Sequence, residues 1–545
     1  MRRSASMTER RNQDYVVTTE TGGQELTDAG REWLASWVTD TDSNVYAFTP
    51  DADAQAVAAA MARLSRNPHD LRTIIAKEFS SDESKEIDLL RRVVSQFGDD
   101  SVMQLLGGQL VFEGVSNLAT KEIEWGRLAA YLEQSTRYLR FDKKDANGKY
   151  SYYTPEEFDE DTKIEYEARM DEIFDIYSDL YEKMLAYIKD NSSIPEKERD
   201  AAWRTACHAQ ACDAVRSLLP ASTKATVGVQ GSMQAVQNMI HHMMSHELPE
   251  VRTLGHGALE AIRGVAPVFF ERTDMPERGG LIQNHRQTTR DESRELATEL
   301  LRDYETNEHR GTRVTLISVD GSEEELVAKI LADSSSYPYE EMISFVAGLS
   351  DEQKKRAIDT YAGDRYNRRA KPGRAFELLD YLFEIQCDYG AFRDIQRHRM
   401  VSAFEWQQLR PSLGHVVSQN VKDAGLEEPY ERAFKLSNEL YDTLQSRGYT
   451  DQAQYATLFG HIMRFTVKVN ARSFTHTAEL RTTPQGHPSY RKIYQDMYEQ
   501  VATVHPNVAA TIRFVSQAED EELARLGAER YSAQKFGQEK PGSSN

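Results

Sequence analysis

The sequence has few cysteines, no long apolar run and no excess of positive charge. Three cysteines among 545 residues are too few for a disulfide framework. No apolar stretch approaches the roughly 18–20 residues that a membrane-spanning helix needs. The net charge of −21 argues against a nucleic-acid backbone as the main partner. We therefore expect a cytoplasmic protein that binds neither membrane nor nucleic acid. A pocket holding a few arginines remains compatible with a small anionic substrate.

Two of the cysteines lie close together, which raises the question of a metal site. Cys207, His208 and Cys212 fall in the segment AAWRTACHAQACDAVRSLL. Its apolar positions recur at helical spacing, so buried thiols on a helix are the better interpretation, and no metal is predicted.

The length predicts two or more domains, because a single hydrophobic core rarely serves so long a chain. Residues 1–42 are interpreted as a partly disordered leader, since their start is basic and lacks the apolar stretch of a secretory signal. Residues 536–545 are interpreted as a disordered tail.

An internal repeat organises the rest of the chain. SNVYAFTPDADAQAVAAAMARLS, from Ser43, and TRVTLISVDGSEEELVAKILADSS, from Thr312, both pass from an extended segment to a helical one. Each leads through a short apolar segment to an arginine-bearing motif and ends in a helix, GSMQAVQNMIHHMMS or NARSFTHTAELR. We expect one unit at 43–280, a linker helix at 281–311 and a second unit at 312–535.

The first unit carries an insertion at about 141–200, which opens on Asp-Ala-Asn-Gly, a turn signal, and continues as an amphipathic helix. Long helices dominate, with a few strands at the start of each half. The predicted fold class is α+β, two tandem units that form a pseudo-dimer, each with helices packed on a mainly antiparallel sheet.

Arg397-His398-Arg399 is a dense cationic cluster. On its own, such a triplet is most often part of a solvated helix surface. Here it follows LLDYLFEIQCDYGAF, an apolar segment that we expect in the core, and burying cations without an anion is costly. The polar positions after it, Glu405 and Arg410, are spaced to line a cleft.

The two arginine-bearing motifs together resemble the pattern of the flavin-dependent thymidylate synthases, which is RHR, seven residues, serine, and then Arg-Tyr. The second half has the triplet but Gln407 at the serine position. The first half reduces the triplet to Trp125-Gly126-Arg127 but keeps the rest of the pattern, namely Ser135, Arg137 and Tyr138. Neither half matches the pattern alone, and together they supply all of it.

The same division continues along the chain. The first half has Arg216 in RSLLP, where the second half has Gln454. The second half keeps the family's closing helix, whereas the first half has lost its residues. Aligning Arg127 with Arg399 places Glu133 opposite Glu405 without a gap.

The resemblance implies a role for each matching residue. The flavin-contacting residues, which include the catalytic triplet, would be Arg397, His398, Arg399, Glu377, Asn470, Arg472 and His476. The residues that bind the phosphate, base and sugar of dUMP would be Ser135, Arg137, Arg216, Arg481 and Glu133. Several arginines suit a phosphomonoester, because the planar guanidinium donates paired, charge-assisted hydrogen bonds. For a single arginine or for Glu133, a surface position is about equally compatible with the sequence.

The reaction that the resemblance implies is reductive methylation of dUMP to dTMP, with FAD as cofactor and with NADPH and methylenetetrahydrofolate as co-substrates. Family members are homotetramers whose active sites are shared between subunits. A fused chain needs to keep the nucleotide-binding residues (the nucleotide arm) in only one copy and the flavin-binding residues (the flavin arm) in only the other. We therefore expect one site per chain, between the halves, and a homodimer that forms a pseudo-tetramer.

Three departures from the family pattern leave alternatives open. They are Gln407 for serine, Asp394 where glutamine is frequent, and His476 for asparagine. A flavoenzyme acting on another pyrimidine nucleotide, or a non-catalytic nucleotide- or flavin-binding relative, would also fit the sequence.

Overall fold

The computed structural model describes residues 15–64, 67–78, 100–306, 308–518 and 522–538. The chain divides into two compact units that alternate along the sequence, so the units differ from the two halves of the repeat. The first unit takes 1–113, 125–133 and 226–304, and the second takes 114–124, 134–225 and 305–545. The second unit therefore combines segments from both halves.

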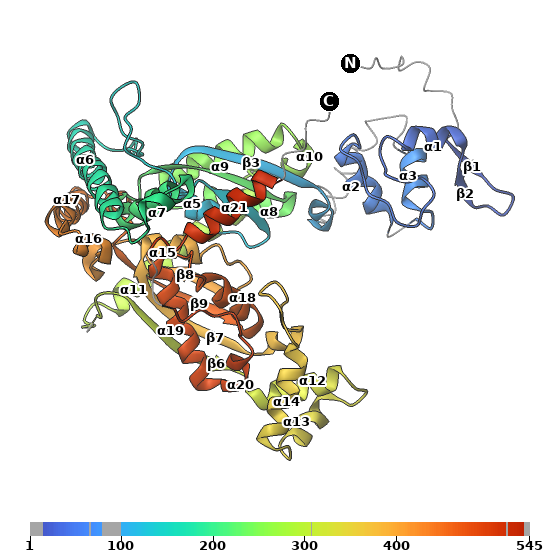
Figure 1. The fold of residues 1–545 in the computed structure, drawn as a ribbon. Helices are drawn as coiled ribbons and strands as arrows, with labels where there is room; N and C mark the ends of the chain where they lie inside the picture. The colour runs from blue at the N-terminus through green and yellow to red at the C-terminus, as the bar shows by residue number, and fades with distance from the viewer. Residues whose placement is uncertain (1–14, 65–66, 79–99, 307, 519–521, 539–545) are drawn as a thin grey trace. The chain divides into compact units, whose positions relative to one another are not determined.

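The first unit is built on a three-stranded sheet, ordered β3-β5-β4, with helices α8 and α9 packed against each other beside it (Figure 1). β4 and β5 pair antiparallel, with Ala129 opposite Gly231 and Glu133 opposite Val227. The elements are β1 (Val16–Thr18), β2 (Gln24–Leu26), α1 (Asp28–Leu34), α2 (Ala54–Arg63), α3 (Leu71–Glu78), η4 (Asp100–Gln104), β3 (Gly107–Ser116), β4 (Ala129–Glu133), β5 (Lys224–Ser232), α8 (Met233–Met244), α9 (Pro249–Arg263), α10 (Pro267–Phe270) and α11 (Gly279–Leu300).

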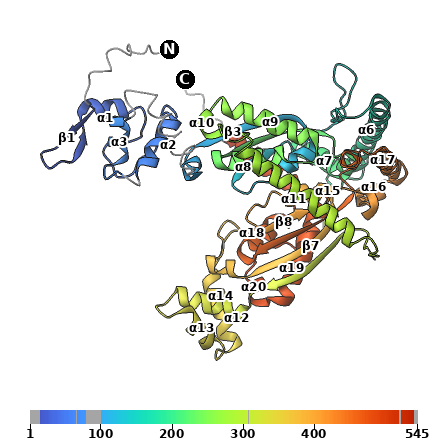
Figure 2. The same ribbon diagram turned by 180° about the vertical axis from the view of Figure 1, so that it is seen from behind.

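The second unit is built on a four-stranded antiparallel sheet, ordered β6-β7-β9-β8, with α18 and α19 packed beside it (Figure 2). Its central strands β7 and β9 alternate buried and partly buried residues, the pattern of a sheet that faces the core on one side. The strands are β6 (Arg313–Asp320), β7 (Asp380–Asp388), β8 (Ala403–Trp406) and β9 (Ile462–Asn470).

Helices make up most of the rest of the second unit. They are α5 (Asn117–Ile123), α6 (Glu160–Asp190), η5 (Glu196–Glu198), α7 (Ala201–Val215), η6 (Arg216–Leu218), α12 (Glu323–Asp333), α13 (Tyr339–Val346), α14 (Asp351–Ala362), η7 (Arg374–Leu378), α15 (Tyr389–Ile395), η8 (Pro411–Leu413), α16 (Gln419–Asp423), α17 (Glu427–Ser446), η9 (Gln452–Ala456), α18 (Ala471–Arg481), α19 (Pro488–Val504), α20 (Pro506–Ala510) and α21 (Leu526–Gln538).

The repeat predicted from the sequence is visible in the order of elements. β3, α5, β4, α7, β5 and α8 in the first half recur as β7, α15, β8, α17, β9 and α18 in the second. In each copy the last residue of a strand caps the next helix with its side chain. Ser116 and Asp388 cap α5 and α15, and Ser232 and Asn470 cap α8 and α18.

Within the second unit, equivalent turns of the two copies pair with each other. Pro220 and Leu458 form an isolated antiparallel bridge. Its hydrogen bonds run from Ala221 N to Thr457 O (2.7 Å) and from Phe459 N to Leu219 O (2.8 Å). Arg216 and Gln454 each lie four residues before a bridge residue, which supports the alignment of these two positions.

The segment interpreted as an insertion contains a turn and a long helix. Asp145 O accepts a hydrogen bond from Gly148 N, which closes the turn, and α6 follows with one buried side. The charged linker predicted at 281–311 is helical over Gly279–Leu300 as α11. Of the segment interpreted as a leader, residues 15–42 contain β1, β2 and α1, and residues 1–14 lie outside the described residues. Of the predicted tail, 539–545 lie outside them and 536–538 end α21.

One expectation about the strands is wrong. We expected strands at the start of each half, but β7, β8 and β9 lie deep within the second half. The opening of the first half forms only a bridge between Phe48 and Val38, in contrast to the eight-residue strand β6. A short stretch of β-branched and aromatic residues does not determine whether another strand pairs with it. The sequence therefore predicts the repeat better than it predicts the positions of the strands.

The cysteines are buried, as predicted for Cys207 and Cys212 on α7, and Cys387 lies on β7. Burial raises the pKa of Cys212 to about 12 and the pKa of Cys387 well above its usual range, so both are thiols at neutral pH. In the part of the chain that is described, no helix is long and apolar enough to cross a membrane.

Candidate functional site

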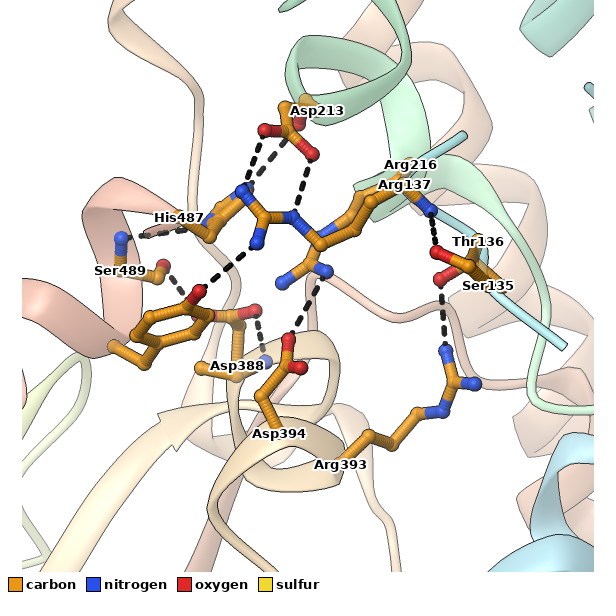
Figure 3. A network of polar contacts seen from close by, with 12 residues as sticks. Ser135, Thr136, Arg137, Asp213, Arg216, Asp388, Arg393, Asp394, His487 and Ser489 are labelled. Carbon is orange, nitrogen blue, oxygen red and sulfur yellow. Dashed lines mark hydrogen bonds and ion pairs between the residues drawn. The ribbon is translucent and has the colours of Figure 1, made fainter. Parts of the chain in front are cut away.

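Four secondary-structure boundaries of the second unit bring arginines of both halves together. From the first half come Arg137, in the irregular segment after β4, and Arg216, where α7 tightens into η6. From the second half come Arg481, the last residue of α18, and Arg397, just after α15. All four are residues that the sequence assigned to a site, and Figure 3 shows the contacts of Arg137 and Arg216 from close by.

Arg137 is held by Asp213 on α7 in a paired arrangement. Its Nε and Nη2 donate to the two carboxylate oxygens of Asp213 at 3.0 and 2.9 Å, and its Nη1 donates to the Tyr490 hydroxyl at 2.9 Å. Burial opposes both charges, but each offsets this cost for the other. The pKa of Arg137 is therefore raised, and the pKa of Asp213 is lowered to about 2. Both groups are charged at every physiological pH.

Asp394, at the end of α15, is the meeting point of the two halves. Its Oδ2 accepts a hydrogen bond from Arg216 Nη1 at 3.3 Å, and its Oδ1 lies 3.8 Å from Arg481 Nη1. Arg481 Nη2 also donates to the backbone carbonyl of Asp394. Burial would raise the pKa of Asp394, but the field of Arg216, Arg481, Arg137 and Arg397 holds it well below its usual range. Two guanidinium groups thus contact this carboxylate, and two more add to the positive field around it.

His398 contacts the same cluster. Its Nε2 accepts a hydrogen bond from Arg481 Nε at 2.7 Å, which requires the neutral imidazole with its proton on Nδ1. Burial, and then the charge of Arg481, hold the pKa of His398 well below its usual range. His398 therefore orients Arg481 as a neutral acceptor.

Further polar contacts fix the surrounding segments (Figure 3). Arg393 Nη1 donates to Thr136 Oγ1 at 3.0 Å, which ties α15 to the segment of Ser135 and Arg137. Ser489 donates to the capping residue Asp388 at 2.6 Å, and burial raises the pKa of that carboxyl. A cavity of about 650 Å³ lies beside this network, with Asp213, His487 and Ser489 among its lining residues.

Four of the residues assigned to the flavin side lie on η7, at the end of β9 and on α18, namely Glu377, Asn470, Arg472 and His476. Arg472 Nε donates to the Pro372 carbonyl at 2.9 Å, and its Nη1 donates to Glu377 Oε1 at 3.2 Å. The Asn470 side-chain oxygen caps α18 by accepting from Ser473 N, which leaves its amide group as a donor. His476 follows Arg472 by one helical turn.

The remaining assigned residues lie at strand ends. Glu133 is the buried last residue of β4 and belongs to the first unit. Glu405 is exposed on β8, and Arg410 donates to Glu308 at 2.6 Å. Gln407, at the family's serine position, is exposed after β8. Ser135 Oγ accepts a hydrogen bond from Arg137 N at 3.2 Å.

Three residues of the cluster were missed or misjudged from the sequence. Asp213 precedes Arg216 by three residues on one helix, so the spacing was a usable signal for a shared face. Asp394 was counted as a departure from the family pattern, but it is the carboxylate on which both halves converge. Tyr490 carried no signal in the sequence, because only the fold brings it to Arg137.

Buried neutral histidines near the cluster predict a loss of stability in mild acid. Burial lowers the pKa of His487 to about 3, and it lowers the pKa of His461 to about 3 as well. Below the unfolded value of about 6.5, the unfolded chain gains protons that the native state does not. Each histidine should therefore lower the free energy of unfolding by about 1.4 kcal/mol per pH unit from about pH 6 toward pH 4.

Thermal unfolding followed between pH 7 and pH 4.5 measures this slope. The melting temperature should fall with pH, and the fall should be shallower in His461→Gln, because the variant lacks one of the titrating groups. An unchanged slope in this variant would contradict the assignment.

Comparison with known proteins gives a consistent result over both halves. The family model described as thymidylate synthase complementing protein matches residues 44–268 and 315–507. A "UPF0159 protein" of Chlamydia muridarum is 30% identical over 519 residues, which cover 92% of this chain and 97% of the relative. A flavin-dependent thymidylate synthase of Clostridium tetani is 24% identical over 228 residues, covering 41% of this chain and 83% of the relative.

Among solved structures, the chain is similar to the UMP/dUMP methylase PolB of Streptomyces cacaoi bound with 5-Br dUMP. The identity is 17%, the TM-score is 0.30, and the match covers 37% of this chain and 95% of that one. Each of the two matched regions of the family model contains one copy of the structural repeat. The chain therefore belongs to the family of thymidylate synthase complementing proteins, the flavin-dependent thymidylate synthase family, as a tandem, double-length member.

Proposed function

We propose that the arginine cluster of the second unit binds the phosphate of dUMP. The carrying observation is the convergence of Arg216 and Arg481, one from each half, on the single carboxylate of Asp394. Within the described part of the chain, the buried Nη2 of Arg216 has no hydrogen-bond partner. A buried guanidinium nitrogen without an acceptor is costly, and a phosphate oxygen would satisfy it.

The charge balance supports an anion of this kind. Asp213 neutralises Arg137, and Asp394 is shared by Arg216 and Arg481, with Arg397 adding to the field. The cluster thus carries excess positive charge inside a protein of net charge −21. A phosphate monoester dianion is a small ligand that fits such a set of rigid donors.

The flavin-side residues fit an anionic dinucleotide such as FAD. His476 Nδ1 is buried and has no partner among the described residues. Burial lowers the pKa of His476, and the positive charges of Lys371, Arg368, Arg481 and Arg365 lower it further. The neutral imidazole with its proton on Nδ1 would donate a hydrogen bond to a diphosphate oxygen, and the surrounding cations suit the same group. The residues that would hold FAD are Glu377, Asn470, Arg472, His476 and the triplet Arg397-His398-Arg399.

The reaction that we propose is conversion of dUMP to dTMP, with methylenetetrahydrofolate as carbon donor and NADPH as reductant. Bound FAD would supply the hydride chemistry. The chain's own residues bind and orient the nucleotide. Arg137, Arg216 and Arg481 hold its phosphate, Asp213 and Asp394 keep these arginines fixed, and neutral His398 sets the orientation of Arg481. Cys212 and Cys387 are buried thiols with raised pKa values, which is compatible with a mechanism without a cysteine nucleophile.

Two measurements test the proposal. Purified protein incubated with FAD should retain flavin absorbance after gel filtration, and the loaded protein should form dTMP from dUMP, methylenetetrahydrofolate and NADPH. The gene should rescue a strain that requires thymidine, and Arg399→Ala should not. Flavin binding without dTMP formation would favour a flavoenzyme of another pyrimidine nucleotide, and absence of flavin binding would refute the enzyme assignment.

The division of labour between the halves makes a separate prediction. The double change Ser135→Ala, Arg137→Ala should raise the dissociation constant for dUMP at least tenfold, because it removes a charge-assisted donor, while FAD remains bound. Arg472→Ala should do the reverse. Isothermal titration with each ligand checks both variants. If the first-half change affects FAD alone, the assignment of the nucleotide arm is wrong.

A further inference from the structure

The C-terminal segment 522–538 extends beyond the family match, which ends at residue 507. It packs through α21 against α7, the helix that carries Asp213. Arg530 anchors it by an ion pair to Asp200 at 3.3 Å, and Leu523 N donates to Gln210 Oε1 at 3.0 Å. The segment also supplies Leu523, Ala524 and Arg525 to the wall of the 650 Å³ cavity.

Arg525 contacts the nucleotide arm in three ways. Its Nη2 donates to Asp213 Oδ2, the oxygen that also accepts from Arg137 Nη2. Its Nη1 donates to the backbone carbonyl of Arg137 at 3.4 Å. Its guanidinium lies 4.7 Å from the centre of the Tyr138 ring, within the range of a cation–π contact. The Arg525 side chain is only 8% exposed.

We propose that Arg525 is a positioning residue for phosphate binding, supplied by a segment outside the family match. This inference rests on the proposed function of the cluster. Residues 134–141 form neither helix nor strand, so the conformation of Arg137 depends on contacts from other elements. Arg525 holds Asp213, which is the side-chain partner of Arg137. It also contacts the backbone carbonyl of Arg137 and the ring of the next residue, Tyr138.

Arg525 also changes the charge of the site. Without it, Arg137 and Asp213 form a neutral pair that offers little attraction to an anion. With it, one carboxylate is shared by two guanidinium groups, and the trio carries one positive charge. The excess charge should favour a phosphate while leaving the binding of an uncharged nucleoside unaffected.

The test compares dUMP with deoxyuridine in the full-length protein, each titrated calorimetrically up to millimolar concentration. Arg525→Gln should weaken dUMP binding on the order of tenfold and leave deoxyuridine binding unchanged. Arg525→Lys keeps the charge and should restore most of the dUMP affinity. Arg530→Gln removes the ion pair of the same helix to Asp200, which caps the end of α7 opposite to Asp213, and should bind dUMP like the wild-type protein.

Each other outcome is decisive. Equal dUMP affinity of Arg525→Gln and the wild-type protein would overturn the inference. So would equal losses for dUMP and deoxyuridine that Arg525→Lys does not restore, because these indicate a general structural role. If the wild-type protein itself does not bind dUMP, the proposed function fails, whatever Arg525 does.

Discussion

Replacing Arg216 by glutamine should weaken dUMP binding by roughly a hundredfold, about 3 kcal/mol, and leave FAD binding unchanged. Arg216 is almost fully buried, donates to Asp394 and has a second guanidinium nitrogen available for an acceptor. The bound phosphate would lose a paired, charge-assisted donor. Glutamine is the substitution of choice, because Gln454 occupies the equivalent turn of the second copy and is buried there as well.

The measurement is the dissociation constant for dUMP, with circular dichroism to verify the fold. Arg447→Gln is a matched control, since Arg447 ends α17 in the same unit and pairs with Glu165 at 2.6 Å at the surface. It should bind dUMP like the wild-type protein. If Arg216→Gln binds dUMP with unchanged affinity, the phosphate does not occupy this cluster.

The change Asp394→Asn should have two opposite effects. Loss of the carboxylate leaves Arg216 and Arg481 without their shared counter-ion, which should lower the free energy of unfolding by about 3–5 kcal/mol. The same loss raises the positive charge of the cluster, so inorganic phosphate or dUMP should bind more tightly. Ligand should therefore raise the melting temperature of the variant by more than it raises that of the wild-type protein.

Thermal unfolding with and without millimolar phosphate checks this prediction, and chloride at equal ionic strength is the control. A variant as stable as the wild-type protein would mean that Asp394 does not balance the arginines. A variant that is destabilised and also binds dUMP less tightly would mean that Asp394 favours dUMP binding by holding Arg216 and Arg481 in place more than its negative charge opposes it.

The sequence predicted the repeat well, because the repeat depends on local patterns. A capping residue, a helix and an arginine at fixed spacing recur in each copy and are readable without the fold. Arg137, Arg216 and Arg481 were named from motifs, and the structure brings all three within one unit.

The partners of these arginines were not predictable in the same way. Tyr490 and Arg525 are 353 and 388 residues from Arg137, and only the packing of α19 and α21 brings them there. In the sequence, Asp394 is only a departure from the family pattern. Its role depends on the cations around the buried carboxylate, and the sequence does not show that they lie there. The strand expected at the start of the first half, near Phe48, is only a single bridge to Val38. A strand forms only where a partner strand pairs with it, and the sequence did not show whether one would.

The central claim is that arginines from both halves form one nucleotide site in each chain. Calorimetric titration of the full-length protein with dUMP tests it most directly. We expect one dUMP bound per chain. The affinity for dUMP should fall to a similar extent in Arg216→Gln, from the first half, and in Arg481→Gln, from the second half. Two dUMP molecules per chain, or a site that depends on only one of these arginines, would contradict it.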